Sequence, residues 1–467
     1  MRIFPPVADG DAQRVSQMRF RRRLFTSTHR DDVREAARAR FGLERAGAMD
    51  AAIDWPSNPY PTLWEQMCAL YVHEPRVRGP SERAAAAVRA SRHWVRMQRG
   101  QRDTLGLREL LILLDLNQET GALVTRPVYP DLFTPPVPLA SDPSQLGEIG
   151  VWLEVGDEDW ELRQYDLNAV SYVRSTLSAT DGRLVEAERF EGADYPWVAG
   201  GVSFIPGVLY HAAETGYLLD WETGTDVAHA SVGLCVDYTS AQHAHADASW
   251  PQRGMIDGDV EGAETHNVAP GSSAPARSVV VADPSVVLKV TSTMDKQARE
   301  FQWTASADPE ALLRYCRVRY QGIAAAAGIR TPEVTRAASD IRSGYSLAVS
   351  REAMAELQLK FKQVFGAADR ELLHKAALML GEPSEGPEAW TVRYRPLRWA
   401  GAEQAQIVTQ VAQARAAGLM TRLEAVLTLH PDLTEDEARE MIDEIDAEGP
   451  PPALPGAVPP AGAQAGG

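Results

Sequence analysis

The sequence predicts an α+β fold in which helical and β-rich regions follow one another along the chain. Residues 110–210 consist of short alternating segments separated by Gly and Asp turns, a pattern typical of antiparallel hairpins. Apolar residues recur at helical spacing before this region, in Glu82–Arg99, and after it, in Leu347–Leu380.

The composition is that of a globular protein. Of 467 residues, 44% are hydrophobic and 24% are charged, which suits about three domains of ordinary size. No apolar run reaches the roughly 18 residues of a membrane span, and no apolar stretch follows Arg21–Arg23 as a secretory signal requires. Three widely separated cysteines, Cys68, Cys235 and Cys316, indicate buried thiols in a reducing compartment. We therefore expect a chain made in the cytoplasm, without a membrane contact.

Charge is distributed unevenly along the chain. The net charge is −17, which argues against a protein that holds nucleic acid over its whole surface or reads its sequence. Residues 1–50 nevertheless hold eleven Arg and seven acids, whereas residues 421–448 hold two Arg and ten acids. Residues 330–351 carry four Arg and two acids, so local contact with phosphates is compatible with this distribution.

Three helical segments are expected before the β region. Residues 1–50 form an Arg-rich, partly helical arm, either a solvated surface helix or a contact for nucleic acid or a partner. Thr62 is the expected N-cap of the next helix, with Glu65 completing a capping box. Glu82–Arg99 should form one helix that ends at Gly100.

The central part of the chain is expected to run from hairpins into two helices. A turn at Asn117–Gly121 should join the first pair of strands of the β region. Residues 225–249 have a helical pattern, and residues 251–278 have the composition of an extended loop. Asp308 and Pro309 then start a helix that runs to Gly328.

The C-terminal part is predicted to be mostly helical. Leu347–Leu380 contains no proline, and a helix of this length would be roughly 50 Å long. Residues 389–399 form one expected strand, and three helices follow, the first ending at Gly418. Capping boxes at Thr421 and Thr434 start the other two. The Pro- and Gly-rich residues 449–467 should be disordered.

One group of residues resembles catalytic chemistry. His243, His245 and Asp247 have the types of side chain that bind a metal ion, and they leave a metal-dependent hydrolase as an alternative function. A His-x-His pair shares one face on a strand, but here the surrounding pattern is helical. Phosphate-binding, nucleophile-elbow and zinc motifs are absent from the sequence. No catalytic residue, metal or cofactor is therefore expected, and the chain is not expected to be an enzyme.

The order of these segments over residues 55–448 resembles a bacteriophage portal protein, the head-to-tail connector of tailed phages. Three stretches carry the resemblance: "GGVSFIPGVLYH", "RSGYSLAVSREAMAELQLKFKQVFGAADREL" and "AAGLMTRLEAVLTLHPDLTEDEAREMIDEI". They are similar to the family's strand before the first stem helix, its tunnel-loop exit with the long helix that follows, and its helical C-terminal end.

The resemblance implies the following division of the chain. After the arm at 1–50 come a wing of helices and β hairpins (51–220), a first stem helix (221–249), a clip (250–305), a second stem helix (306–328), a tunnel loop (329–346), a long helix with a strand returning to the wing (347–400), a helical crown (401–448) and the tail (449–467).

The resemblance also implies a function. The chain would be a structural ring of about twelve subunits at one capsid vertex, through which double-stranded DNA is packaged and ejected. Its expected partners are the large terminase, the major capsid or scaffold protein and a head–tail adaptor, and its expected location is the virion, after assembly in the host bacterial cytoplasm. Another virion component, such as a minor capsid or adaptor protein, is the remaining alternative.

The resemblance also suggests residues that would line the channel. The expected tunnel loop comprises Ser339, Asp340, Ile341, Arg342, Ser343, Gly344 and Tyr345. Gly344 would give this loop backbone freedom where it joins the long helix. On the second stem helix, Arg314, Arg317 and Gln321 share one polar stripe with Glu310 and would face the DNA or a neighbouring subunit.

Overall fold

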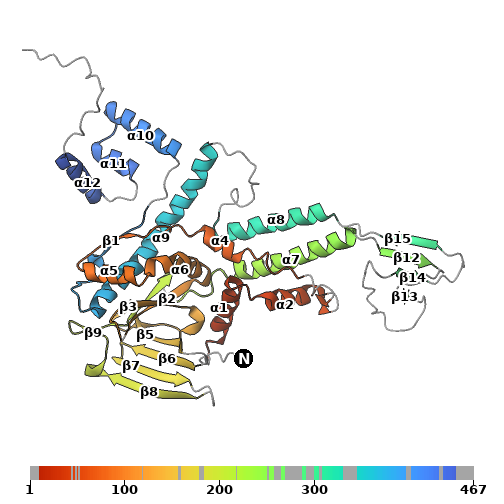
Figure 1. The fold of residues 1–467 in the computed structure, drawn as a ribbon, viewed down its shortest axis with the longest axis horizontal. Helices are drawn as coiled ribbons and strands as arrows, with labels where there is room; N and C mark the ends of the chain where they lie inside the picture. Colours follow the sequence, from red (N-terminus) through yellow and green to blue (C-terminus); the bar gives the residue numbers. More distant parts are fainter. Residues whose placement is uncertain are drawn as a thin grey trace, which may run out of the picture. The chain divides into compact units, whose positions relative to one another are not determined.

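The fold is mixed α and β, and its sheets are mainly antiparallel (Figure 1). The computed structural model describes residues 10–43, 46–47, 50, 53–117, 119–155, 159–177, 183–216, 218–249, 252–256, 265–268, 287–290, 299–303, 308–329, 344–395, 401–430 and 435–448. The chain divides into two compact units. Unit 1 comprises Met1–Ile341 and Glu356–Val392, and unit 2 comprises Arg342–Ala355 and Arg393–Gly467.

Two antiparallel sheets form the β region of unit 1. The first has the strand order β11–β2–β3, and the second has the order β4–β5–β6–β7–β8. Their strands are β2 (Glu109–Leu116), β3 (Leu123–Val128), β4 (Val137–Leu139), β5 (Asp142–Val155), β6 (Asp159–Asp166), β7 (Ser171–Leu177), β8 (Leu184–Glu191) and β11 (Gly207–His211). The hairpins expected at 110–210 are thus confirmed.

The first hairpin turn shows how the local sequence sets the register. The side-chain oxygen of Asn117 accepts hydrogen bonds from the backbone N–H groups of Glu119 and Thr120, at 2.9 and 3.1 Å. Gly121 follows with φ +64°, a conformation that favours glycine. The predicted turn at Asn117–Gly121 is confirmed.

Smaller elements complete this region. A two-stranded hairpin joins β9 (Val198–Ala199) to β10 (Val202–Ser203). Short 3-10 helices within the described residues include η2 (Pro130–Leu132), η3 (Gly192–Asp194) and η5 (Pro387–Ala389).

The three-stranded sheet β11–β2–β3 and the five-stranded sheet β4–β5–β6–β7–β8 share one apolar core. Alternate residues of β2, Leu111 and Leu113, belong to the same buried cluster as Val151 of β5 and Tyr165 of β6. Each such side chain contributes about 1.5–3 kcal/mol when it is fully buried. The cluster holds the sheets together because the period of two in each strand directs these side chains to a common side.

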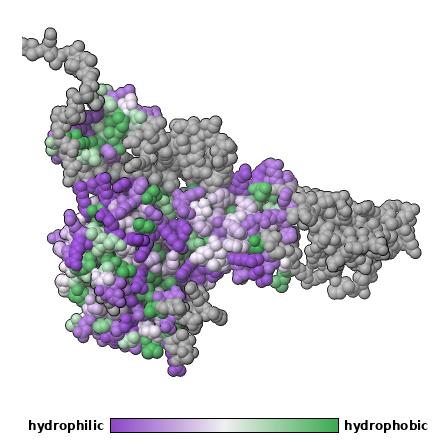
Figure 2. Space-filling model, viewed as in Figure 1, coloured by the Kyte–Doolittle hydropathy of each residue, from purple (hydrophilic) through white to green (hydrophobic). Residues whose placement is uncertain are grey.

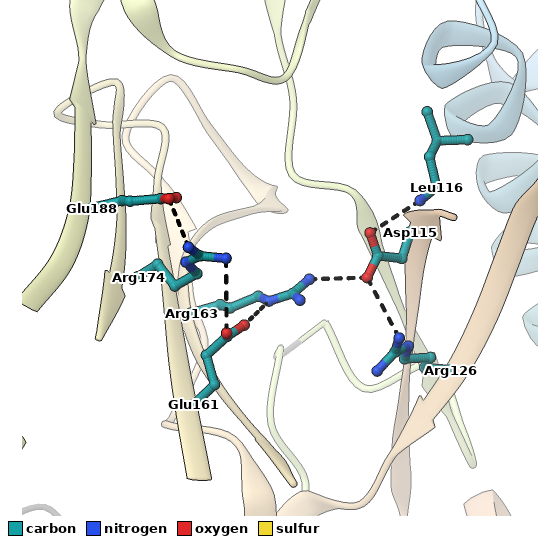
Figure 3. A network of polar contacts seen from close by, with 7 residues as sticks. All are labelled: Asp115, Leu116, Arg126, Glu161, Arg163, Arg174 and Glu188. Carbon is teal, nitrogen blue, oxygen red and sulfur yellow. Dashed lines mark hydrogen bonds and ion pairs between the residues drawn. The ribbon is translucent and has the colours of Figure 1, made fainter. Parts of the chain in front are cut away.

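Charged side chains pair where this apolar face ends (Figure 3). Asp115 follows Leu113 on β2 with the same alternation, and Arg163 of β6 approaches it at 3.1 Å. Arg163 also contacts Glu161 at 2.5 Å, and Arg174 of β7 reaches Glu188 of β8 at 2.6 Å. This series of ion pairs links the two sheets and extends across the second one. Each half-buried charge in it therefore has a partner of opposite sign.

The first two helices are part of unit 1. They are α1 (Ala12–Phe25) and α2 (Arg30–Phe41). Arg14 is almost fully buried and donates hydrogen bonds to the carbonyl oxygens of Pro130 and Phe133, at 2.6 and 2.7 Å. Met18 and Leu24 are also buried. The predicted solvated arm is therefore wrong for α1, because its arginines satisfy carbonyl groups of the fold.

Two helix boundaries before the β region differ from the prediction. Helix α4 (Tyr60–Gln66) begins at Tyr60, so Thr62 lies inside it and is not its N-cap. The segment expected as one helix is divided into α5 (Glu82–Ala90) and α6 (His93–Leu107), and Arg92 between them has φ +58°.

Gly100 lies within α6 and does not end it. A Cβ at Gly100 would come within 2.8 Å of the Met97 sulfur, so glycine here permits close packing.

Helices α7 (Thr225–Ser249) and α8 (Pro309–Ala326) lie side by side in unit 1 (Figure 1). Asp308 caps α8 by accepting a hydrogen bond from the N–H of Glu310 at 3.0 Å, as predicted. The chain between the helices contains a four-stranded sheet in the order β13–β14–β12–β15.

The strands of this sheet are β12 (Gln252–Ile256), β13 (Thr265–Val268), β14 (Val287–Val290) and β15 (Arg299–Trp303). Two of them, β12 and β13, fall in the segment expected to be an extended loop, so that expectation is wrong.

Helix α9 (Gly344–Met379) is anchored in unit 1 by a buried carboxylate. Asp369 is fully buried and accepts hydrogen bonds from the hydroxyls of Tyr71 and Tyr210, at 2.9 and 2.7 Å. His93 of α6 lies 3.9 Å from the same carboxylate. Tyr210 belongs to β11, so the contact joins the long helix to a sheet strand distant in the sequence.

Within the segment expected as a strand at 389–399, the structure has β16 (Thr391–Arg393), which pairs with β1 (Arg76–Arg78). Residues 396–399 lie outside the described residues.

Unit 2 contains α10 (Gly401–Ala416), α11 (Arg422–Leu429) and α12 (Glu435–Glu448). Gly418 has φ +71° and follows α10 as predicted, and the N–H of Leu419 bonds back to the carbonyl of Ala414. The capping box of Thr421 and Glu424 is present. The second predicted capping residue, Thr434, and the tail at 449–467 lie outside the described residues.

We expect Tyr210→Phe to lower the free energy of unfolding by about 1.5–3 kcal/mol, because it removes a hydrogen bond from a buried carboxylate. Urea denaturation of both proteins would measure the change. Tyr238→Phe is the matched control, since within the described residues the Tyr238 hydroxyl forms no hydrogen bond, and its effect should stay below about 0.5 kcal/mol. Equal effects of the two substitutions would contradict the role given to Asp369.

Candidate functional site

The helix pair α7–α8 is the candidate site. Specific contacts with the rest of unit 1 fix the positions of these two helices. At the start of α7, the fully buried Arg21 of α1 donates to the hydroxyl of Thr225 at 2.5 Å and to the carbonyl of Thr223 at 3.1 Å. Phe20 stacks on His229, with ring centroids 4.8 Å apart. Burial lowers the pKa of the Arg21 guanidinium. Helix α1 thus fixes the first turns of α7.

A buried carboxylate joins three helices further along α7. Asp237 is buried, and its two oxygens contact Arg40 of α2 and Arg319 of α8, the latter at 2.6 Å. The hydrogen bond from Arg40 to Asp237 raises the pKa of Arg40. A buried carboxylate without such partners would cost several kcal/mol, so Asp237 requires both guanidiniums to lie against α7.

Small and apolar residues form the contact between the two helices. Gly233 of α7 lies opposite Arg319, whose Nη2 would be 3.4 Å from an added Cβ. On α8, the side chains of Cys316, Ile323 and Ala324 are buried. Burial raises the pKa of the Cys316 thiol, as expected for a packed and unreactive cysteine.

The three sequence-predicted stem residues lie together on the other side of α8. Glu310, Arg314, Arg317 and Gln321 fall within about 60° of the helix circumference at 100° per residue. Arg314 and Arg317 are exposed and Gln321 is half-buried. Arg314 contacts Glu310 at 3.3 Å, an exposed ion pair of little energetic weight. Arg314 and Arg317 are therefore accessible to solvent or to a polar ligand.

Apolar residues flank this polar stripe on both sides. Ala311, Val318, Gly322 and Ala325 lie along one flank, and Val318 is 59% exposed. Leu313 lies on the other flank and is 54% exposed. Figure 2 shows hydrophobic and hydrophilic side chains next to one another on the visible face of this helix pair. An apolar surface on each side of one helix is typical of a partner contact.

Most of the predicted tunnel loop cannot be compared with the structure. Ser339, Asp340, Ile341, Arg342 and Ser343 lie outside the described residues. Gly344 and Tyr345 are the first two residues of α9. The helix was expected to begin at Leu347, so α9 starts three residues earlier and includes Gly344 and Tyr345 of the expected loop.

A second buried carboxyl lies near the segment that leads into α7. Glu109, at the start of β2, accepts a hydrogen bond from the backbone N–H of Asp220, and Asp220 pairs with Arg108 at 2.8 Å. Burial raises the pKa of Glu109 to about 7. The ionised form of this carboxyl is thus disfavoured in the folded protein.

The alternative metal site gains no support from the fold. His243, His245 and Asp247 all lie on α7, where positions two apart point about 200° away from each other. His245 is exposed and His243 half-buried. Among the residues whose side chains are described, no group of three His, Cys, Asp or Glu is arranged to hold a metal ion. Within the same ranges, no helix is both long and apolar enough to cross a membrane.

The sequence interpretation missed Asp237, Arg319 and Asp369. The sequence does contain one indication that Asp237 is buried and paired, because this residue is an isolated acid in the apolar stretch "VGLCVDYT". Such a residue in a buried helix needs a cationic partner. The identity of that partner could not be read from the sequence, since Arg40 is 197 residues away.

Comparisons with known proteins give similarity to solved structures. No family model and no curated protein sequence matches this chain. Among solved structures, it is similar to a chain described as "Virion of native gene transfer agent (GTA) particle", with 13% identical residues and a TM-score of 0.41. The match covers 85% of this chain and 98% of that chain. At this TM-score the similarity assigns no function.

Glu109→Gln should flatten the pH dependence of stability. Because the pKa of Glu109 is raised, its contribution to stability is complete below about pH 4.5 and is lost as the pH rises through about 7. Between pH 5 and pH 8, the free energy of unfolding of the glutamine variant should therefore rise by up to about 3 kcal/mol relative to that of the wild type. Urea denaturation across this range measures the difference. Parallel stability curves for the two proteins would contradict the buried position of the carboxyl.

Proposed function

We propose that the protein is a portal protein, which forms a ring at one capsid vertex and lets double-stranded DNA pass through it. The observation that carries the proposal is the helix pair α7–α8 with a four-stranded sheet inserted between its helices. This is the arrangement that the sequence resemblance implies for a stem and a clip. The order of the other elements, from β-rich region to long helix to helical end, is also the one expected.

The surface of α8 supports assembly into a ring. In a ring of identical chains, each subunit uses two different patches, one toward each neighbour. Val318 lies on one flank of the polar stripe and Leu313 on the other. If both flanks meet neighbouring subunits, the stripe of Arg314 and Arg317 is left facing the centre of the ring.

The charges suit a DNA molecule that slides. Each phosphate contact adds affinity, so a moving duplex requires few and weak contacts. Arg314 and Arg317 are accompanied by Glu310 on the same stripe, which limits the positive potential. Helix α12 carries eight acids and one arginine, and it would repel a DNA backbone.

Helix α9 follows the proposed tunnel loop in the sequence. The loop precedes Gly344, and the Asp369 contacts anchor the same helix to α6 and β11. Ser339–Tyr345 remain the residues proposed to contact DNA.

The remaining parts of the proposal follow from the resemblance. The ring would contain about twelve subunits, and its partners would be the large terminase, the major capsid or scaffold protein, and a head–tail adaptor. It would be located in the virion and would catalyse no reaction. The metal-dependent hydrolase is not pursued, because α7 separates His243 from His245 on its circumference.

The proposal is tested by native mass measurement and negative-stain electron microscopy of the full chain. We expect rings with a central hole and a mass about twelve times 51.1 kDa. Val318→Glu should abolish or strongly reduce the ring, because it places a charge in an apolar contact between subunits. Arg317→Gln is the matched control on the same helix and should leave the ring intact.

Two results would contradict the proposal. One is a wild-type chain that stays monomeric at every concentration tested, and the other is a closed particle without a central hole. The second result would favour another virion component, such as a minor capsid or adaptor protein.

A further inference from the structure

Unit 1 carries a dense group of arginines away from α7 and α8. Residues 75–102 contain eight Arg, no Lys and one acid, in a chain whose net charge is −17. We name this group the arginine surface. It consists of Arg76 and Arg78 of β1, Arg83 and Arg89 of α5, Arg92 between the helices, and Arg96, Arg99 and Arg102 of α6.

The fold places the elements that carry these arginines next to one another. Helix α5 packs against both β1 and α6, so the three elements are neighbours. All eight arginines are exposed except Arg102, which is half-buried. On α6, Arg92 and Arg102 are separated by a rise of about 15 Å, a length over which a DNA duplex carries roughly nine phosphate charges.

The carboxylates nearby neutralise only part of this charge. Arg83 pairs with Glu382, Arg89 with Glu74, and both Arg99 and Arg102 with Asp103. With Glu82, and leaving Arg78 out of the count, four carboxylates face seven guanidiniums, which leaves an excess of three positive charges. The pairs of Arg83, Arg89 and Arg99 are more than 60% exposed on the arginine side, so a phosphate can displace them at little cost.

Two arginines retain their full charge for a ligand. Within the described part of the chain, Arg76 and Arg92 form no ion pair, and both are exposed. Arg92 also has φ +58°, a conformation that costs a residue other than glycine about 1 kcal/mol or more. Arg96 donates to a backbone carbonyl, that of Thr125, so its charge is not neutralised either.

We propose that the arginine surface binds the phosphate backbone of double-stranded DNA, outside any channel formed by α8. Guanidinium groups bind phosphate oxygens in a bidentate manner, and every basic residue of this surface is an arginine. The negative charge of the rest of the chain does not prevent this contact, because it is screened beyond about 10 Å at 0.1 M salt. The binding is independent of base sequence. The identification of the ligand as double-stranded DNA rests on the proposed function, whereas the positive charge of the arginine surface does not.

The experiment measures binding of a short mixed-sequence DNA duplex to the full chain by fluorescence anisotropy, between about 50 and 200 mM salt. The test variant is Arg76→Gln/Arg92→Asn/Arg99→Gln. Asparagine is used at position 92 because it tolerates a positive φ. We expect affinity to fall about tenfold or more and the slope of log K against log salt to decrease by about 2 to 3.

Two further variants make the result specific. Arg30→Gln/Arg38→Gln/Arg189→Gln removes the same charge from exposed positions on α2 and β8 and should change affinity by less than about threefold. Arg314→Gln/Arg317→Gln removes the charge of α8 and should also leave most of the binding. Retention of binding by both, with loss in the test variant, supports the arginine surface.

Three outcomes would overturn the proposal. The first is that the wild type does not bind the duplex at the lowest salt concentration. The second is that the test variant and the α2–β8 control lose affinity equally. The third is that polyglutamate displaces the duplex as effectively as unlabelled DNA does, which would identify an acidic protein as the ligand. Failure of α8 to form a ring leaves each of these readouts unchanged, so the two proposals are tested separately.

Discussion

Burial of Asp237 is the constraint on which the arrangement of the helix pair depends. A carboxylate in the middle of an apolar helix cannot be left unpaired, and the chain supplies Arg40 from the N-terminal region and Arg319 from α8. Since Arg40 is 45% exposed and Arg319 is 32% exposed, their charges remain partly solvated. Burial of this one carboxylate thus requires two other helices, α2 and α8, to pack against α7.

The same constraint explains the unequal surfaces of the two helices. Helix α7 is surrounded by α1, α2, α4 and α8, and most of its residues from Val227 to Ala241 are buried. Helix α8 covers one side of α7 and leaves its own far side open, with a polar stripe and two apolar flanks. We propose that this far side is half of an interface, and assembly with other copies is therefore the central claim of the proposed function.

Features set by nearby residues could be predicted from the sequence. The Asn117–Gly121 turn, the Asp308 cap and the Thr421 capping box each depend on contacts within a few positions. Features set by distant contacts could not. Gly100 was interpreted as a helix end because a packing glycine and a capping glycine look alike. Strands β12 and β13 pair with β14 and β15, and local composition does not specify such partners. The polar stripe of α8 follows from helical spacing, but spacing does not determine its ligand.

The most direct test of the central claim is cysteine labelling of α8 before and after assembly. Val318→Cys and Arg317→Cys each place a thiol on the exposed side of this helix, and maleimide modification is read by mass spectrometry in dissociated and assembled protein. The account predicts that position 318 is labelled only in the dissociated chain, whereas position 317 is labelled in both states. Equal labelling of position 318 in assembled particles would show that α8 does not contact a neighbouring subunit, and would contradict the proposed ring.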